Sequence, residues 1–498
     1  MTTHPTVSGP AVVVGSGPNG LIGAIRLAQA GLDVTVVERN DHLGGGLHSS
    51  RHPLGTIHDH CAAVVPLATA SHALASLGIG PDWAGFRCSR YDLAHPFLDG
   101  SAAVLHRSLD RTQHDLGPDG TALAGAVRLR PRRLGRAQRR GLRPDAPRPR
   151  HPLALAHFAR TAALPATVVA RRFATARARA LFAGCAAHAV RPLTELGSAA
   201  TGLLLVAAGH RGGWPVVAGG TGALADELVA LGRSAGVEYR CDDSVDRADR
   251  LDRYPVALLD VGARAALPSR RRRRAGAHRS ALAAVPVGAA AYKLDLVVDG
   301  GVPWAAEACH HAATVHVGGS FDEIVEAEAA VHRGRVSSTP LVLVAQPGVA
   351  DPARASGSLQ PIWLYTHVPL GTDADLSELL DRPGRTVAPA PSPHRLDVDH
   401  QPGGLRGRQP ELRRRRHRDR SHLAPPVDRA AAAVADAVCA RGPGSVPVLG
   451  GDPARPEGPR IVWVERSRPR PPPTRSLSRR SSSRRDRRVG DRSVGLVS

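Results

Sequence analysis

The chain has 498 residues, a formal net charge of +22 and a sequence pI near 11.2, yet only 3% of its residues are aromatic. A chain of this length normally forms two or three domains with large cores. Lys293 is the only lysine among the 66 basic residues, whereas proteins that neutralise phosphates usually mix lysine with arginine and interleave aromatic residues. The composition therefore argues against a dedicated nucleic-acid-binding protein, although the charge permits non-specific binding.

The first informative unit occupies residues 11–38. A short run of valines typical of a buried parallel strand is followed by three glycines with G-x-G-x-x-G spacing, Gly15, Gly17 and Gly20. The first glycine allows a tight turn, the second a close approach of a diphosphate, and the third close packing of helix on strand. The N-terminus of the following helix would bind the phosphates.

The residues after the glycines complete a strand, helix and strand. Leu21, Ile22, Ile25 and Leu27 predict a helix with an apolar face that ends at Gly31, and 34–37 predict a second strand. Glu38 then stands where a carboxylate accepts a hydrogen bond from a ribose hydroxyl. The unit predicts a dinucleotide site whose contacts come from Gly15, Ser16, Gly17, Pro18, Asn19, Gly20, Glu38 and Arg39.

A second glycine cluster, Gly44, Gly45 and Gly46, follows almost immediately. A plain NAD dehydrogenase needs no such cluster, and a glycine run lets the chain pass close to a cofactor. The cluster favours FAD over NAD(P), with an ordinary loop as the simpler alternative.

These motifs resemble those of FAD-dependent oxidoreductases of the phytoene desaturase and amine oxidase type, in particular the phytoene dehydrogenase-related branch. The resemblance extends in blocks over about two-thirds of the chain. The blocks are V-V-V-G-S-G-P-N-G-L at 12–21, residues 38–46, His58-Asp59-His60-Cys61 with Pro66-Leu67, Ala94-His95-Pro96, Gly213-Trp214-Pro215 with Gly219-Gly220, Tyr292-Lys293-Leu294-Asp295, and Val302-Pro303-Trp304.

The resemblance implies an α/β fold with a Rossmann-like FAD-binding domain and a mixed-sheet and helical substrate domain. In that family Gly219-Gly220 opens a helix, residues 237–240 return to the FAD domain as a strand, and Val245 lies in an adenosine-contacting turn. The implied activity is hydride abstraction from a hydrophobic substrate to flavin.

The expected domain boundaries follow the same blocks. We expect an FAD-binding domain in two parts, 1–80 and 211–265, with 256–261 as a buried strand. A cap or substrate region would occupy 81–210, with helices such as 173–188, and a substrate domain 286–378, with strands at 341–344 and 362–365. A disordered Arg/Pro-rich tail is expected over 379–498.

Arginine runs without lysine indicate GC-rich codons read out of frame. For 409–420 one permitted coding, read one base later, gives N-P-N-Y-V-G-G-D-I-A-T, and the same shift recovers family-like sequence from 394–408 and 442–465. Two earlier stretches also look translated out of frame. The stretch 128–133 lies in a scrambled region near 126–147, and the stretch 270–274 precedes Tyr292. The hypothesis is a frameshifted translation beyond about residue 380, inactive as translated; disordered basic linkers are the alternative.

Few other residues offer chemistry. Lys293 is the candidate catalytic residue, because a partly buried lysine near a flavin can hold a water or tune the ring; a surface lysine on a strand edge is the simpler interpretation. His58 and His60 point the same way on a strand, but a third metal ligand is not visible, so we prefer a loop beside the flavin and expect no metal.

The remaining expectations concern partners and location. The six cysteines form no C-x-x-C pair, which argues against a dithiol flavin reductase or a zinc site and favours the reducing cytoplasm. The sequence contains no uncharged apolar run of about 18 residues, so it predicts no transmembrane helix. We expect a hydrophobic small-molecule substrate and no specific nucleic acid, and a peripheral membrane contact is compatible with this. The alternatives are an NAD(P)-binding dehydrogenase and a non-specific basic nucleic-acid-binding protein.

Overall fold

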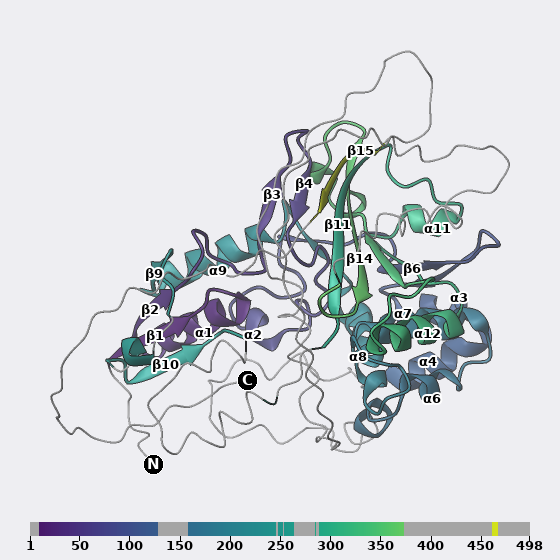
Figure 1. The fold of residues 1–498 in the computed structure, drawn as a ribbon, viewed down its shortest axis with the longest axis horizontal. Helices are drawn as coiled ribbons and strands as arrows, with labels where there is room; N and C mark the ends of the chain where they lie inside the picture. Colours follow the sequence, from purple (N-terminus) through teal and green to yellow (C-terminus); the bar gives the residue numbers. More distant parts are fainter. Residues whose placement is uncertain are drawn as a thin grey trace, which may run out of the picture.

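The computed structural model describes residues 9–127, 158–245, 248–251, 253–262, 284, 288–372 and 461–466. The arginine runs at 128–133 and 270–274 lie outside these residues, as do almost all of the region 126–147 and all of the expected tail except 461–466. Within the described part, the chain forms two units that stand side by side (Figure 1).

The first unit is built on a four-stranded parallel sheet with strand order β10-β1-β2-β9. Helices α1 and α9 pack against one another beside it. Its elements are β1 (Pro10–Val14), α1 (Pro18–Gln29), β2 (Asp33–Val37), α9 (Gly222–Ser234), β9 (Glu238–Arg240) and β10 (Val256–Leu259).

The β1–α1–β2 segment confirms the strand, helix and strand predicted for 11–38. Leu21 and Ile25 are fully buried on α1, while Ile22 and Leu27 pack partly buried against the same side. The helix ends at Gln29, and Gly31 has a φ of +89°, the left-handed conformation that suits glycine after a helix.

The second unit is built on a seven-stranded mixed sheet with strand order β15-β11-β14-β13-β12-β6-β7. Neighbouring strands are antiparallel except β12 and β6, which are parallel. The strands are β6 (Leu93–Pro96), β7 (Ala102–Leu105), β11 (Ala290–Asp299), β12 (Thr314–Val317), β13 (Val342–Ala345), β14 (Leu359–Val368) and β15 (Ile461–Arg466).

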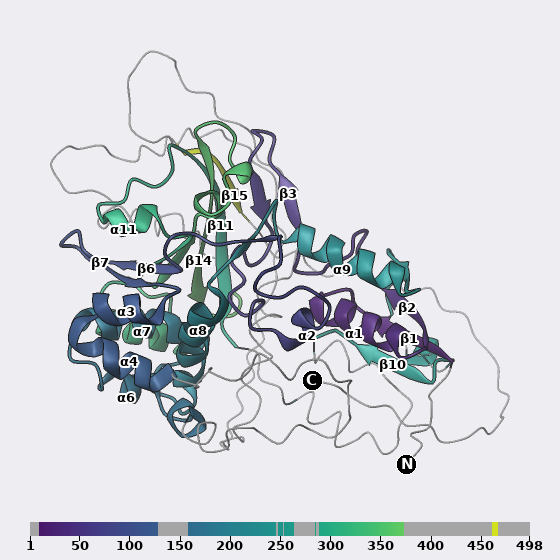
Figure 2. The same ribbon diagram turned by 180° about the vertical axis from the view of Figure 1, so that it is seen from behind.

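A group of helices packs at one end of the mixed sheet (Figures 1 and 2). Alanine-rich α7 lies at its centre, as predicted for 173–188, and contacts α8, α12 and α6. The helices of this unit are α3 (Leu109–Asp115), α4 (Gly120–Val127), α6 (Ala166–Ala170), α7 (Ala176–Ala187), α8 (Ser198–Gly212), α11 (Glu307–His310) and α12 (Phe321–His332).

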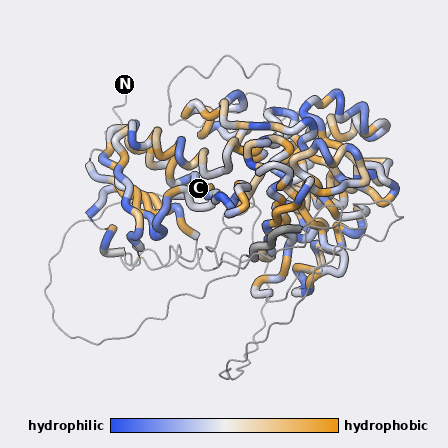
Figure 3. The backbone as a smooth tube through the Cα atoms, turned by 90° about the horizontal axis from the view of Figure 1, so that it is seen from above, coloured by the Kyte–Doolittle hydropathy of each residue, from blue (hydrophilic) through white to orange (hydrophobic). Residues whose placement is uncertain are grey.

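The remaining elements are short. They are the hairpin β3 (Ser49–Arg51) and β4 (Ile57–Asp59), the pair β5 (Phe86–Arg87) and β8 (Val216–Val217), helix α2 (His72–Ala75), and the single 3₁₀ turns η1 (Gly117–Asp119), η2 (Ala248–Leu251), η4 (Pro347–Val349) and η5 (Pro352–Arg354). Each unit has its own hydrophobic core. Hydrophobic segments, coloured orange in Figure 3, occur in both units.

One expectation needs correction. Residues 58–60 were expected in a loop, but His58 and Asp59 belong to β4, because the chain at 49–51 pairs with 57–59. Within the expected tail, the described residues 461–466 form β15, which pairs antiparallel with β11. Their β-branched and aromatic residues, Ile461, Val462 and Trp463, favour a strand. In the described part of the chain, no helix combines the length and apolar character needed to cross a bilayer.

Candidate functional site

The first glycine turn lies at the bend between β1 and α1. Gly15 has a φ of +98° and donates its N–H to Val37 O at 2.8 Å, so the bend is closed by the end of β2. Pro18 occupies the first turn of α1, and the residue before it, Gly17, contributes no side-chain cap. The backbone N–H groups at this helix terminus are therefore directed to a ligand or to other parts of the chain.

Glu38 faces this turn from the carboxyl end of β2. It is 5% exposed, and its Oε2 accepts hydrogen bonds from Ser16 N at 2.9 Å and Ser16 Oγ at 2.7 Å. Its Oε1 accepts one from Asn40 N at 3.0 Å. Each carboxylate oxygen has two acceptor sites, so Oε2 is fully used and Oε1 retains capacity for one further donor.

The second glycine cluster packs directly on the first turn. Gly44 N lies 3.1 Å from Ser16 O and 3.2 Å from Ser16 Oγ. A Cβ atom on Gly45 would lie 2.9 Å from Gly17 Cα, and Gly45 has a φ of +56°. Only glycine fits there, so the sequence uses glycine to bring two separate turns into contact.

The other predicted cofactor residues lie around the same edge. Val245 packs with Val12, Val14 and Val37 at the carboxyl ends of β1 and β2. Arg39 is exposed next to Glu38, and Gly46 is half-buried after the second turn. The structure gathers these residues at one edge of the sheet, and their contact with a cofactor stays a prediction.

Asp260, which the sequence interpretation did not single out, also lies at this turn. Its Oδ2 accepts a hydrogen bond from Gly20 N at 2.8 Å. It follows β10 directly, and carboxyl ends of parallel strands meet at one edge of a sheet. An acidic residue near the carboxyl end of the predicted strand 256–261 was the available signal.

Lys293 is buried rather than on the surface, so the strand-edge interpretation is wrong. Its side chain is 8% exposed, and β11 has a neighbour on each side. Its Nζ donates to Asp59 O at 3.0 Å, forms an ion pair with Asp295, and lies 5.9 Å from the centre of the Trp363 ring.

A row of side chains crosses one face of the mixed sheet beside Lys293. In register, Lys293 pairs with Tyr365, Tyr365 with Leu343, and Leu343 with His316. His188 from α7 covers the row: its Nδ1 lies 3.1 Å from Tyr365 Oη, and its Nε2 lies 3.1 Å from His316 Nε2. Sequence periodicity gave no signal for this row, because its members come from four separate segments.

Burial keeps His188, His316 and Tyr365 of this row neutral at pH 7. Desolvation lowers the pKa of His188 to about 3, and it lowers the pKa of His316 well below its usual range with help from His188. Desolvation likewise raises the pKa of Tyr365. The row therefore offers neutral donors and acceptors. A cavity of about 10 Å³, lined by His188, Leu341, Leu343, Tyr365 and His367, is the size of one water molecule.

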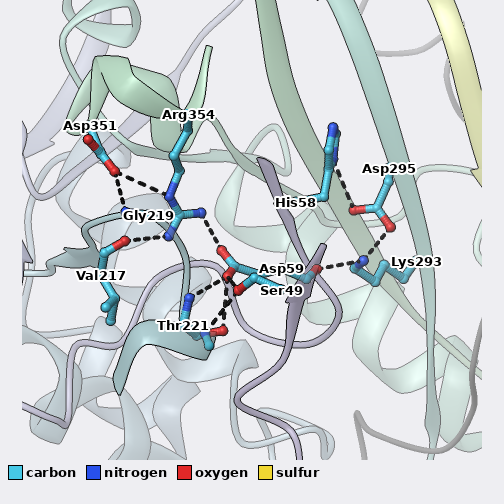
Figure 4. A network of polar contacts seen from close by, with 11 residues as sticks. Ser49, His58, Asp59, Val217, Gly219, Thr221, Lys293, Asp295, Asp351 and Arg354 are labelled. Atoms are coloured by element: carbon cyan, nitrogen blue, oxygen red, sulfur yellow. Dashed lines mark hydrogen bonds and ion pairs between the residues drawn. The ribbon is translucent and has the colours of Figure 1, made fainter. Parts of the chain in front are cut away.

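A buried ionic network joins the two units (Figure 4). Asp59 pairs with Arg354, and its Oδ1 accepts hydrogen bonds from Thr221 N at 2.6 Å and Ser49 Oγ at 2.7 Å. Arg354 Nη2 donates to Val217 O at 2.7 Å. On the other side, His58 Nδ1 lies 3.8 Å from Asp295 Oδ1, and Asp295 pairs with Lys293.

The network fixes the mixed sheet against the hairpin that follows the second glycine turn. His58 thus belongs to a polar network. Among the described residues, no group of three or more His, Cys, Asp or Glu side chains is arranged to hold a metal ion.

Comparison with known proteins supports the Rossmann-like part. The family model described as an NAD(P)-binding Rossmann-like domain matches residues 13–77. Thiamine thiazole synthase from Aeropyrum pernix is 61% identical over 36 residues, which form 7% of this chain and 13% of that protein. The match thus spans a small part of that curated relative. The four-stranded parallel sheet and its glycine turn, which include most of residues 13–77, form a Rossmann-like domain, as predicted.

Several solved structures are similar to a larger share of the chain. An oxidoreductase from Methanosarcina mazei is 15% identical with a TM-score of 0.49, covering 76% of this chain and 83% of that one. A fatty acid isomerase from P. acnes is 17% identical with a TM-score of 0.46, covering 76% and 82%. Cyclohexylamine oxidase from Brevibacterium oxydans is 14% identical with a TM-score of 0.42, covering 75% and 79%. Likeness at this level concerns chain arrangement, not activity.

Proposed function

We propose that this chain is an FAD-dependent oxidoreductase of the phytoene dehydrogenase-like type, acting on a hydrophobic small molecule. The proposal depends on one observation: two glycine turns, 15–20 and 44–46, pack against each other around Ser16 beneath the Glu38 carboxylate. A single glycine turn suits any dinucleotide, whereas a second turn in contact with it favours the longer flavin nucleotide.

The residues present fit the diphosphate and adenosine part of such a cofactor. Gly45 and Gly17 lack the Cβ atoms that would fill the space between the turns. The N-terminus of α1 offers backbone N–H groups and the positive end of the helix dipole. Glu38 holds Ser16 in place and keeps acceptor capacity for a ribose hydroxyl.

The mixed sheet would supply the substrate side. Bound flavin supplies a hydride acceptor, and the protein orients the substrate and excludes water. Lys293 would lie at the flavin end of this face, because it reaches Asp59 O in the hairpin that follows the second glycine turn. Trp363, whose ring is 5.0 Å from that of Tyr365, extends the wall along β14. We propose that Lys293 positions groups at the reacting centre.

An NAD(P)-dependent dehydrogenase is the second candidate. The description of the matching family model, NAD(P)-binding, favours it. The contact between Gly45 and Gly17 favours FAD instead, because a nicotinamide dinucleotide needs only the first turn.

Purification of the full chain tests the proposal. The protein should carry or take up FAD, released on denaturation and recognised by its absorption spectrum, and a hydrophobic substrate should bleach the flavin. NADH and NADPH should not raise the midpoint of thermal unfolding, whereas FAD should. Uptake of NAD(P) with no response to FAD would contradict the proposal.

A matched pair of variants locates the site. Glu38→Gln removes a charged acceptor and should weaken FAD binding about tenfold, since a hydrogen bond to a charged group contributes about 1.5–3 kcal/mol. Glu238→Gln, on exposed Glu238 of neighbouring β9, should leave FAD binding unchanged. Equal effects of both changes would place the nucleotide elsewhere.

We also propose that the chain beyond about residue 380 is translated out of frame. Single-base gaps in the coding sequence near the positions for residues 126, 262 and 380 would support this. An intact frame with no family-like peptide in the shifted frame would exclude it.

A further inference from the structure

Asp260 lies at the topological switch point of the parallel sheet. β10 pairs with β1 on the side opposite to β2, and Asp260 N continues this pairing by donating to Val14 O at 2.8 Å. In open α/β sheets, dinucleotides bind in the crevice at this point, with the diphosphate at the N-terminus of the first helix. Asp260 is thus placed at the position through which a diphosphate would pass.

All three glycines of the first turn face Asp260. A Cβ atom on Gly15 would lie 2.2 Å from Asp260 O, and Cβ atoms on Gly17 and Gly20 would lie 2.7 Å and 2.8 Å from Asp260 Oδ2. The same Oδ2 accepts a hydrogen bond from Gly20 N at 2.8 Å, across 240 positions of sequence. The glycines leave space that the sequence analysis assigned to a diphosphate. In the structure, the Asp260 carboxylate of the chain itself also fits into this space.

A carboxylate at this point has the charge that the helix terminus favours. The N-terminus of a helix carries a partial positive charge and unpaired N–H groups, which a side-chain anion satisfies as a phosphate does. Two amides of the turn are already used by acidic side chains, Ser16 N by Glu38 and Gly20 N by Asp260. A diphosphate at the same terminus would meet the Asp260 carboxylate as a like charge in a partly buried place.

We propose that Asp260 sets the cofactor affinity of this site by competing with the dinucleotide diphosphate for the N-terminus of α1. The carboxylate occupies the terminus when no nucleotide is bound, and binding requires its side chain to turn away. The proposal rests on the proposed function in taking the turn to be a dinucleotide site. It assigns to Asp260 a role separate from that of Glu38, which faces the ribose side.

Binding of ADP and adenosine to the full chain tests this role. Asp260→Asn keeps the shape and an acceptor for Gly20 N but removes the negative charge. It should bind ADP about tenfold more tightly than the parent chain, in calorimetric titrations at about 0.15 M salt, where non-specific attraction to the +22 charge is screened. Adenosine, which lacks the diphosphate, should bind both proteins within about twofold.

Two further variants complete the design. Asp260→Ala removes the carboxylate altogether and should change ADP affinity in the same direction. Asp33→Asn changes an exposed residue at the opposite, amino end of β2 and should leave both affinities unchanged. The unfolding midpoints of all four proteins show whether each is folded.

The outcomes separate this proposal from the proposed function. ADP binding that is equal or weaker in Asp260→Asn than in the parent chain, with FAD still bound, overturns the role of Asp260 alone. Failure of every variant to bind ADP and FAD overturns the dinucleotide site and this role with it. Gain of ADP binding only in the Asp260 variants supports the proposal.

Discussion

Arg354 and Asp59 form an ion pair in which neither side chain is exposed to solvent. Asp59 ends β4, and Arg354 ends η5 near the start of β14, so the pair joins the connecting hairpin to the mixed-sheet unit. Breaking such a pair by removing one partner leaves an uncompensated buried charge.

Arg354→Met should therefore destabilise the protein by about 3–5 kcal/mol, because Asp59 would lose its counter-charge. Denaturant unfolding measures the change. Arg335→Met, which removes an exposed partner of Glu326, should change stability by less than about 1 kcal/mol. Similar small losses in both variants would mean that the buried pair contributes little.

Gly45→Ala should destabilise the protein and weaken nucleotide binding together. The added Cβ would approach Gly17 Cα to 2.9 Å at a φ of +56°, so backbone strain and crowding combine to roughly 3 kcal/mol. Gly31→Ala is the matched control, with a φ of +89° and open space around its Cβ; it should lose about 1 kcal/mol and keep binding. Unchanged FAD affinity in Gly45→Ala would count against the second turn.

Asp92 should make stability fall as the pH rises. Burial raises the pKa of Asp92 from its ordinary value of 3.8 to about 6, so the folded protein holds this proton more tightly than the unfolded chain. The Asp92 carboxyl therefore stabilises the folded protein most below about pH 4. The free energy of unfolding falls by about 3 kcal/mol as the pH rises from there through 6. Asp92→Asn should remove this dependence.

Unfolding free energies at pH 4 and pH 7 measure the effect. Between pH 4 and pH 7 the parent chain should lose about 2.5 kcal/mol of unfolding free energy relative to Asp92→Asn. Asp110→Asn changes an exposed carboxylate and should show no such shift. A constant difference for Asp92→Asn would contradict the raised pKa.

His188 should act with the opposite sign. Its pKa falls to about 3 because burial disfavours the charged ring, whereas the unfolded chain protonates the ring near pH 6.5. Stability is thus lost as the pH drops below about 6.5, by about 3 kcal/mol at pH 4.5. His188→Gln should lessen this loss, and His114→Gln, on an exposed ring, should not. Acid titration of the unfolding midpoint distinguishes the two.

Local sequence signals predicted the geometry of the first glycine turn well. Gly15, Gly17 and Gly20 lie at the strand-to-helix bend, and Glu38 faces it, because strand, turn and helix are each encoded within a few neighbouring residues. The contact between Gly45 and Gly17 follows from the same short segment.

The rest of the site depends on partners far apart in the chain. Arg354 contacts Asp59, and His316 contacts His188, because the folded chain brings together residues that lie far apart in the sequence. Burial of Lys293 was missed for the same reason: whether a strand lies at an edge depends on its neighbours, which hydrophobic periodicity within β11 does not reveal.

The pairing of β1 with β10 has a consequence for biosynthesis. The glycine turn that follows β1 emerges first from the ribosome, yet its contact Asp260 comes 240 positions after Gly20. At a synthesis rate of 5–20 residues per second, roughly 12–50 seconds pass before the ribosome has synthesised β10 and Asp260. During this interval the side of β1 that later pairs with β10 has no strand beside it, so its backbone N–H and C=O groups there are unpaired.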